Sequence, residues 1–379
     1  MAAVNGPFER AGRALLERAD VEVGGERPWD IQVHDERLYR RVLTQGTLGL
    51  GDAYMDGWWA CDALDQFFDR VQRAELSRYV RVTPPALVGR AVNALVNLQR
   101  GARALLVGER HYDLGNDLYE AMLDERMTYS CGYWRDAKDL DEAQEAKLDL
   151  ACRKLGIDAG MRVLDIGCGW GSFAALAAER YKAAVTGVTV SREQAAYAQE
   201  RYKGWPIDVR LEDYRDLDAA RERFDRVVSI GMFEHVGHRN HRRFMEVAHA
   251  MLDEGGLLLL HTIGRDRSSV GIDPWIARHI FPNSALPSMA QITRAAEDLF
   301  VVEDVHNFGH DYDPTLMAWH ANVERAWDEL SDRYEERFHR MWRYYLLSCA
   351  GSFRARKLQL WQIVLSKDRG VDGGYEPVR

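Results

Sequence analysis

Short apolar runs alternate with amphipathic segments through the middle of the chain, from residue 161 to residue 263. Runs such as MRVLDI, AAVTGVTV and FDRVVSIG have the length and the Val/Ile/Leu content of strands, whereas SFAALAAERY, SREQAAYAQERY and HRRFMEVAHAML carry apolar residues at helical spacing. Strands that are apolar along their whole length, with helices between them, are typical of a parallel sheet covered on both faces. We therefore predict an α/β fold with a mostly parallel sheet that binds its ligand at the carboxyl ends of the strands.

The rest of the chain follows other patterns. The first 110 residues mix short helical and aromatic segments without strand–helix alternation, which predicts a small, mainly helical domain at 1–110 beside a second domain at 111–379. A stretch rich in Pro and Gly, from Ile263 to about Ser288, is typical of a lid or binding loop. The chain closes with a predicted strand at 301–308, two helical stretches and a β-rich segment at 357–365.

Composition narrows the class of protein. With 46% apolar and 29% charged residues, the 379-residue chain is close to the average for soluble globular proteins. It contains no uncharged apolar run of about 18 residues and no signal-peptide core, so we expect a cytoplasmic protein. Its five cysteines are odd in number and widely spaced, which argues against a disulfide framework and a zinc site. A formal net charge of −9 gives no overall attraction to nucleic acid.

One segment departs from this acidic balance. From Arg78 to Gly108 the chain has five arginines, no acidic residue and apolar residues at roughly helical spacing. Such a segment is a candidate for contact with a membrane surface. An ordinary surface helix with a solvated basic face fits the same pattern, and the sequence leaves both interpretations open.

The strongest local motif is VLDIGCGWGS, which follows a predicted strand and opens a helix. It supplies one aspartate and three glycines: Asp165, Gly167, Gly169 and Gly171. Glycines there permit positive φ and close approach of a ligand to the backbone, and the helix N-terminus offers free N–H groups. A dinucleotide fingerprint reads G-x-G-x-x-G, whereas this motif reads G-x-G-x-G after an aspartate. It resembles motif I of class I S-adenosylmethionine methyltransferases, and we expect Asp165 near the cationic part of that ligand.

The second strand of the predicted sheet ends in VTVS, without a carboxylate for the ribose hydroxyl groups. Thr189 and Gln194 are the available substitutes, because an amide can both donate and accept hydrogen bonds.

Over nearly its full length the sequence resembles the cyclopropane-fatty-acid synthase family. The segments that carry the match are HYDLGNDLYEAMLDERMTYSCGYW, VLDIGCGWGS, GVTVSREQ, VVSIGMFEHVG, LLLLHTIG, DPWIARHIFPN, DYDPTLMAW and SCAGSFRARKLQLWQ. The N-terminal segment GDAYMDGWW also matches, which favours the bacterial phospholipid-modifying branch over the shorter mycolic-acid enzymes, whose resemblance begins at about His111. The resemblance implies a Rossmann-like class I methyltransferase domain that uses S-adenosyl-L-methionine. It also implies that the substrate is a cis double bond in a phospholipid acyl chain, on which a cyclopropane ring is closed.

This reaction sets its own chemical requirements. An alkene is a poor nucleophile, so its π bond must be placed in line with the sulfonium methyl group in a dry site. Methyl transfer leaves a carbocation, which needs aromatic faces and the exclusion of water. A base must then remove a proton from the new methyl group. The resemblance implies that this base is a bound bicarbonate ion, whose ligands on this chain would be Cys131, Glu234, His261, Ile263 and Tyr312.

Other residues are implied by the same resemblance. Cys349 matches a position often marked as catalytic, although the mechanism needs no thiol nucleophile and a helical cysteine is usually a small buried apolar residue. The cofactor contacts would be Tyr129, Ser130, Leu164, Asp165, Gly167, Cys168, Gly169, Trp170, Gly171, Ser172, Thr189, Gln194, Asp213 and Tyr214, of which the last two match the family only loosely. The implied partners are membrane phospholipids, met peripherally at the inner face of the cell membrane, and a homodimer is left open.

Two other classes of function compete with this one. A methyltransferase acting on an amine or hydroxyl would use the same cofactor fold but would not need the YSCGYW and DYDPT segments. A noncatalytic lipid-binding protein would suit the N-terminal domain but leaves the glycine motif unexplained.

Overall fold

The computed structural model describes residues 6–76, 115–367 and 374–379. The chain divides into two compact units. Unit 1 comprises Met1–Val96, Gly271–Pro282 and Leu316–Leu358, and unit 2 comprises Asn97–Val270, Asn283–Thr315 and Gln359–Arg379. The prediction placed everything after residue 110 in one domain. The observed division differs, because two later segments of the chain pack with the N-terminal helices.

Unit 1 is mainly helical, as the sequence predicts for its N-terminal part. Its elements are α1 (Pro7–Glu17), β1 (Gln32–Val33), α2 (Arg37–Gln45), α3 (Thr47–Met55), β2 (Trp59–Ala60), α4 (Leu64–Arg73), α13 (Pro274–His279), most of α15 (Tyr312–Leu330) and α16 (Glu336–Arg354). Helix α16 packs against α3 and α4. Gly351 permits the close approach, since a Cβ atom there would lie 2.5 Å from the carbonyl oxygen of Asp65. Aromatic rings fill the space between these helices, with Phe68 and Tyr344 5.1 Å apart.

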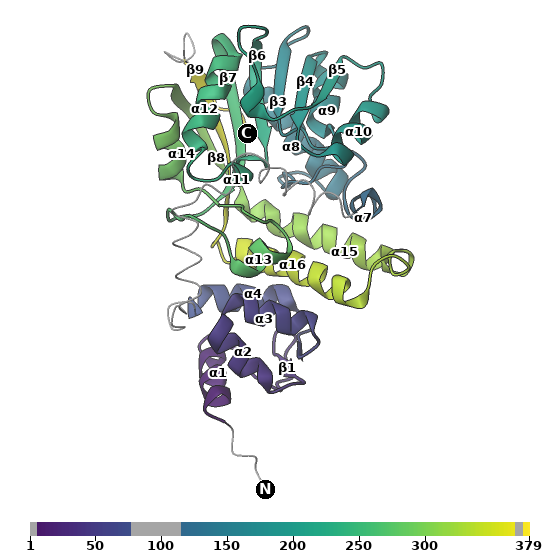
Figure 1. Ribbon diagram of the computed structural model, residues 1–379, viewed down its shortest axis with the longest axis vertical. Coiled ribbons are helices and arrows are strands. Elements are labelled where there is room, and N and C mark those ends of the chain that lie inside the picture. The colour runs from purple at the N-terminus through teal and green to yellow at the C-terminus, as the bar shows by residue number, and fades with distance from the viewer. Residues whose placement is uncertain (1–5, 77–114, 368–373) are drawn as a thin grey trace. The chain divides into compact units, whose positions relative to one another are not determined.

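Unit 2 is built on a seven-stranded sheet in the order β5-β4-β3-β6-β7-β9-β8 (Figure 1). The strands are β3 (Arg162–Ile166), β4 (Ala184–Thr189), β5 (Ile207–Leu211), β6 (Phe224–Ile230), β7 (Leu252–Gly264), β8 (Phe300–Asn307) and β9 (Gln359–Lys367). Strands β3 to β7 pair in parallel, and β9 pairs antiparallel with both β7 and β8. The predicted α/β fold with a mostly parallel sheet is confirmed.

Helices cover both faces of this sheet. They are α8 (Leu140–Leu155), α9 (Ser172–Tyr181), α10 (Arg192–Arg201), α11 (Phe233–Val236), α12 (His241–Met251) and α14 (Met289–Ala296). Unit 2 also contains α7 (Asn116–Met122) and the short 3-10 turns η3 (Tyr214–Asp216) and η4 (Gly309–Asp311). One apolar core joins the sheet to α12 and α14, and a second joins it to α8 and α9. The strands are therefore apolar along their length because both of their faces are buried.

Two expectations from the sequence concern membranes: a basic segment that contacts a membrane surface, and the lack of a membrane-spanning helix. The basic segment 78–108 lies outside the described residues. Within the ranges that the structure does describe, no helix is both long enough and apolar enough to cross a bilayer.

Candidate active site

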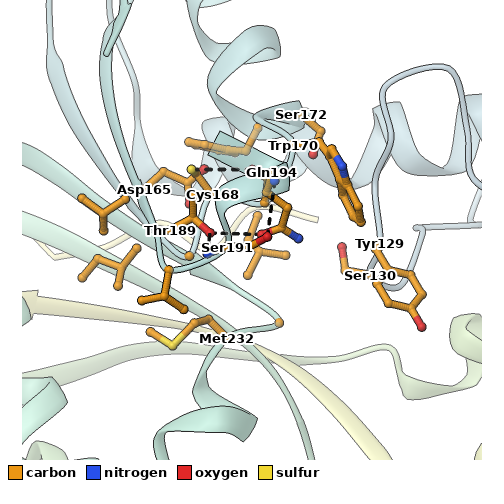
Figure 2. Close-up of a pocket in the computed structure, with 18 of the residues that line it drawn as sticks. Tyr129, Ser130, Asp165, Cys168, Trp170, Ser172, Thr189, Ser191, Gln194 and Met232 are labelled. Carbon is orange, nitrogen blue, oxygen red and sulfur yellow. Dashed lines mark hydrogen bonds between the residues drawn. The ribbon is translucent and has the colours of Figure 1, made fainter. Parts of the chain in front are cut away.

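A pocket lies where the glycine motif links β3 to α9, and it extends along the carboxyl ends of β4, β5 and β6. We call it the glycine-loop pocket (Figure 2). Twelve of the predicted cofactor contacts line it: Tyr129, Ser130, Asp165, Gly167, Cys168, Gly169, Trp170, Ser172, Thr189, Gln194, Asp213 and Tyr214. Two do not. Leu164 is buried in the core beneath the loop, and Gly171 caps α9 with its Cα packed near Tyr202.

The glycine motif turns because its three glycines adopt positive φ. The φ angles of Gly167, Gly169 and Gly171 are 88°, 56° and 86°. A Cβ atom at Gly167 would meet Met232 at 2.6 Å, whereas Gly169 faces open space at the pocket wall. Gly169 therefore leaves room for a ligand against its backbone.

The end of β4 provides polar side chains in place of a carboxylate. Thr189 Oγ1 donates a hydrogen bond to Gln194 Oε1 at 3.0 Å, and Ser191 caps α10 (Figure 2). This bond leaves the Gln194 amide nitrogen to donate. Glu212, directly after β5, also lines the pocket, and the sequence analysis missed it.

Aromatic rings stiffen the opposite wall. The ring centroid of Tyr119 lies 4.9 Å from that of Trp170 and 5.4 Å from that of Tyr129. Trp170 Nε1 donates to Asn116 Oδ1 at 3.1 Å. Figure 2 shows Tyr129 and Trp170 on the same side of the pocket, away from Asp165. Electron-rich faces on one side of the pocket and a carboxylate on the other suit a cationic ligand.

Two buried charged groups line the same pocket, and only one was predicted. Burial raises the pKa of Asp165 to about 7, although Lys147 opposes this shift, and no hydrogen bond joins its carboxyl group to another described residue. Burial lowers the pKa of Lys147 to about 8. Lys147 was missed, yet it falls on the apolar stripe of α8 with Ala143, Leu148 and Ala151, where a lysine is unusual.

A second set of residues, which we call the Glu234–His261 group, lies outside that pocket: Glu234 and His261 are buried, and Ile263 follows His261 on β7. Glu234 lies in α11 and accepts a hydrogen bond from the backbone N–H of Ile263 at 2.6 Å, while its Oε2 has no partner within the described ranges. Burial raises the pKa of Glu234 to about 7. His261, on β7, is 1% exposed, its Nε2 has no partner, and burial lowers its pKa well below the usual range. His261 is therefore neutral, and Glu234, with a pKa of about 7, carries its proton more readily than an exposed glutamate.

Hydrogen bonds join the segment that contains Cys131 to the segment that contains Tyr312. Gly132 N and Trp134 Nε1 both donate to Thr315 Oγ1, at 3.1 and 2.8 Å. Tyr312 is buried at the start of α15, one turn before Thr315. Cys131 is fully buried, and burial raises the pKa of its thiol well above the usual range, so it acts as a neutral thiol. None of Cys131, Glu234, His261, Ile263 and Tyr312 lines the glycine-loop pocket.

Comparisons with known proteins bear on this arrangement. The sequence model of the mycolic acid cyclopropane synthetase family matches residues 100–363. The chain belongs to this family. It is also 50% identical over 370 residues to the cyclopropane-fatty-acyl-phospholipid synthase of Escherichia coli (strain K12), a match that covers 98% of this chain and 96% of that protein. The predicted family and the predicted class, an S-adenosylmethionine-dependent transferase, are confirmed.

Solved structures of the cyclopropane synthetase family agree with the fold. The cyclopropane synthase MmaA2 from Mycobacterium tuberculosis has a TM-score of 0.65 and 33% identity, covering 69% of this chain and 98% of that chain. The mycolic acid cyclopropane synthase CmaA1, complexed with SAH and CTAB, has a TM-score of 0.64 and 34% identity, with the same coverage. These two synthases match about two thirds of the chain, whereas the E. coli relative matches almost all of it. The class I methyltransferase fold is confirmed.

Cys349 stands apart from the other predicted catalytic residues. It lies on α16 in unit 1, while the others belong to unit 2. Burial raises the pKa of its thiol to about 12, so almost no thiolate forms near neutral pH. A catalytic role for Cys349 stays a prediction, tested below.

Proposed function

We propose that this protein transfers the methyl group of S-adenosylmethionine to a cis double bond of a phospholipid acyl chain and closes a cyclopropane ring. One observation carries the proposal: the glycine-loop pocket shares a unit with two buried side chains, Glu234 and His261, whose Oε2 and Nε2 atoms have no partner among the described residues. The E. coli relative, whose name specifies a fatty-acyl-phospholipid product, supports this substrate class over a mycolic acid.

The residues of the glycine-loop pocket fit S-adenosylmethionine. Its sulfonium and ammonium groups suit the carboxyl group of Asp165 and the aromatic wall, and its nucleoside hydroxyl groups suit Thr189 and Gln194. When bound, the cofactor supplies the electrophilic methyl group. The chain's part is to orient that group and to keep water from the cation that follows.

The residues around Glu234 fit a small oxyanion such as bicarbonate. Glu234 Oε2 and His261 Nε2 are buried polar atoms without partners, and such atoms are rare in folded proteins. A protonated carboxyl group and a neutral imidazole can each donate a hydrogen bond, whereas the Cys131 thiol already donates to the Gly132 carbonyl oxygen at 3.2 Å and would have to turn away from it. Ile263 would act indirectly, because its backbone N–H already holds Glu234. Bicarbonate, when bound, supplies a proton acceptor, and these side chains would hold it and keep the site dry.

Peripheral contact with the membrane is part of the proposal. Besides the basic segment at 78–108, unit 1 carries arginines stacked on partly exposed tryptophans: Arg70 lies 3.8 Å from the Trp29 ring, and Arg37 4.5 Å from the Trp58 ring. Tryptophan and arginine are well suited to the boundary between headgroups and acyl chains. A cytoplasmic location and a homodimer also stay predictions.

Product analysis tests the proposal. Vesicles of unsaturated phosphatidylethanolamine or phosphatidylglycerol are incubated with the protein and labelled S-adenosylmethionine, and the lipids are examined by mass spectrometry. The expected product gains one methylene group in the acyl chain and loses its double bond. A methyl group on the headgroup would indicate an amine or hydroxyl methyltransferase instead, and unchanged lipid would indicate a binding protein.

Replacing Arg100 and Arg103 by Glu should weaken sedimentation with anionic vesicles at low salt, and equal sedimentation would refute the membrane role of that segment.

A further inference from the structure

Lys147 is a buried cation in the wall of the glycine-loop pocket with too few protein partners. Its side chain is fully buried, and its Nζ donates one hydrogen bond, to Ser130 Oγ at 2.8 Å. An ammonium group has three donors, and in the described parts of the chain no other hydrogen bond or ion pair joins it to a residue. Buried donors without acceptors are costly, so the remaining donors call for a ligand.

Lys154 is a second buried lysine on the same helix, and its partners can be compared with those of Lys147. It lies two turns further along α8, and its side chain is as completely buried as that of Lys147. Its Nζ, however, lies 3.1 Å from His306 Nδ1 and 3.6 Å from the Asp304 carboxylate. Lys154 does not line the pocket. The lysine that lacks protein acceptors is thus the one that faces the ligand space.

The chemistry of the pocket indicates which ligand group Lys147 meets. The amino-acid end of S-adenosylmethionine carries an ammonium and a carboxylate on one carbon atom. Asp165 offers an acidic group and Lys147 a basic group in the wall of one pocket. Their charges interact, since Lys147 lowers the pKa of Asp165. An acid and a base in the wall of one pocket match the two charges of an amino acid.

We propose that Lys147 binds the carboxylate of S-adenosylmethionine directly, held in place by Ser130. The proposal rests on the function proposed above and adds a residue to its site. Gln144 strengthens the arrangement, because its Nε2 donates to the Ser130 backbone oxygen at 2.7 Å and so fixes the loop to α8. A carboxylate provides acceptors for the remaining donors of the ammonium group.

Calorimetry with two ligands tests this contact without measuring turnover. S-adenosylhomocysteine contains the amino-acid end, and 5′-methylthioadenosine is the same nucleoside thioether without it. Lys147→Met should weaken S-adenosylhomocysteine binding about 10- to 100-fold, the worth of one charge-assisted hydrogen bond, and leave 5′-methylthioadenosine binding unchanged. Retained 5′-methylthioadenosine binding also shows that the variant is folded. Lys154→Met is the matched control and should change neither affinity.

Three outcomes would overturn the inference. Equal losses for both ligands would mean that Lys147 only shapes the pocket, and no loss for either would mean that it makes no contact. Ser130→Ala keeps the ammonium group, so it should cost less S-adenosylhomocysteine affinity than Lys147→Met; a loss as large would place the contact at Ser130. If the unaltered protein binds neither ligand, the cofactor assignment itself falls, which separates failure of the proposed function from failure of this contact.

Discussion

The glycine-loop pocket and the Glu234–His261 group bury polar side chains in opposite ways. In the pocket, Thr189 and Gln194 hydrogen bond to each other, and a ligand can reach the remaining polar atoms. In the Glu234–His261 group, Glu234 Oε2 and His261 Nε2 are enclosed and have no partner. A binding surface must exchange water for ligand, whereas a proton-handling site must exclude water, so the contrast agrees with the division proposed above between holding the cofactor and transferring the proton.

The largest expected effect tests that separation. Glu234→Gln should lower turnover by about 10²–10⁴-fold, the usual contribution of a positioned acid or base. Affinity for S-adenosylhomocysteine should persist, because Glu234 does not line the pocket. Single-turnover rates and calorimetry measure the two quantities, and added bicarbonate should partly restore the rate by mass action. Glu212→Gln, in the pocket wall, is the matched control. If Glu234→Gln instead loses cofactor affinity at an unchanged saturated rate, the two regions are not distinct.

A second prediction concerns a property that the two regions share, a carboxyl group with a raised pKa. Burial raises the pKa of both Asp165 and Glu234 to about 7. A raised carboxyl pKa stabilises the folded state at low pH, and that stability is lost as the pH rises from about 4 through 7. The ligand-free protein should therefore lose on the order of 3 kcal/mol per group over this range. Urea unfolding at several pH values should show a flatter profile for Asp165→Asn and for Glu234→Gln than for the unaltered protein. A profile unchanged by Glu234→Gln would contradict the raised pKa.

A smaller effect is expected at the glycine loop. Gly169→Val should weaken S-adenosylhomocysteine binding by about tenfold or more, because a branched side chain at φ 56° is strained and fills the ligand's approach. Gly160→Val places the same strain, at φ 85° with open space around it, in a turn outside the pocket. Both variants should lose stability in thermal unfolding, and only the first should lose affinity by calorimetry. Unchanged affinity for Gly169→Val would remove the loop from the cofactor site.

The smallest expected effect concerns Cys349, the predicted catalytic residue that lies in unit 1. Cys349→Ala should keep turnover within about threefold, because a thiol with a pKa of about 12 supplies almost no thiolate. Steady-state rates on unsaturated vesicles measure this, with Cys152→Ala, a buried cysteine on α8, as the comparison. A loss as deep as that of Glu234→Gln would extend the chemistry to α16.

Local patterns in the sequence were sufficient to predict the strands, the glycine turn and the residues at the strand ends. The run VLDI forms β3, the glycines adopt positive φ, and His261 lies near the end of β7, because these features depend on neighbouring residues and on the direction of parallel strands. Family motifs added Glu234 and the YSCGYW segment, which no periodicity would single out.

Only the tertiary structure decided how distant segments combine and which groups are charged. The last strand, β9, inserts between β7 and β8, and α16 packs with helices nearly 300 residues earlier, because long-range packing leaves no local signal. Lys147 falls on the apolar stripe of α8, but only the fold shows that its ammonium group is buried in a pocket wall, and the neutrality of His261 likewise follows from its burial. The sequence by itself thus determined the fold class and the cofactor loop, while burial, which depends on the whole fold, determined the protonation of the site.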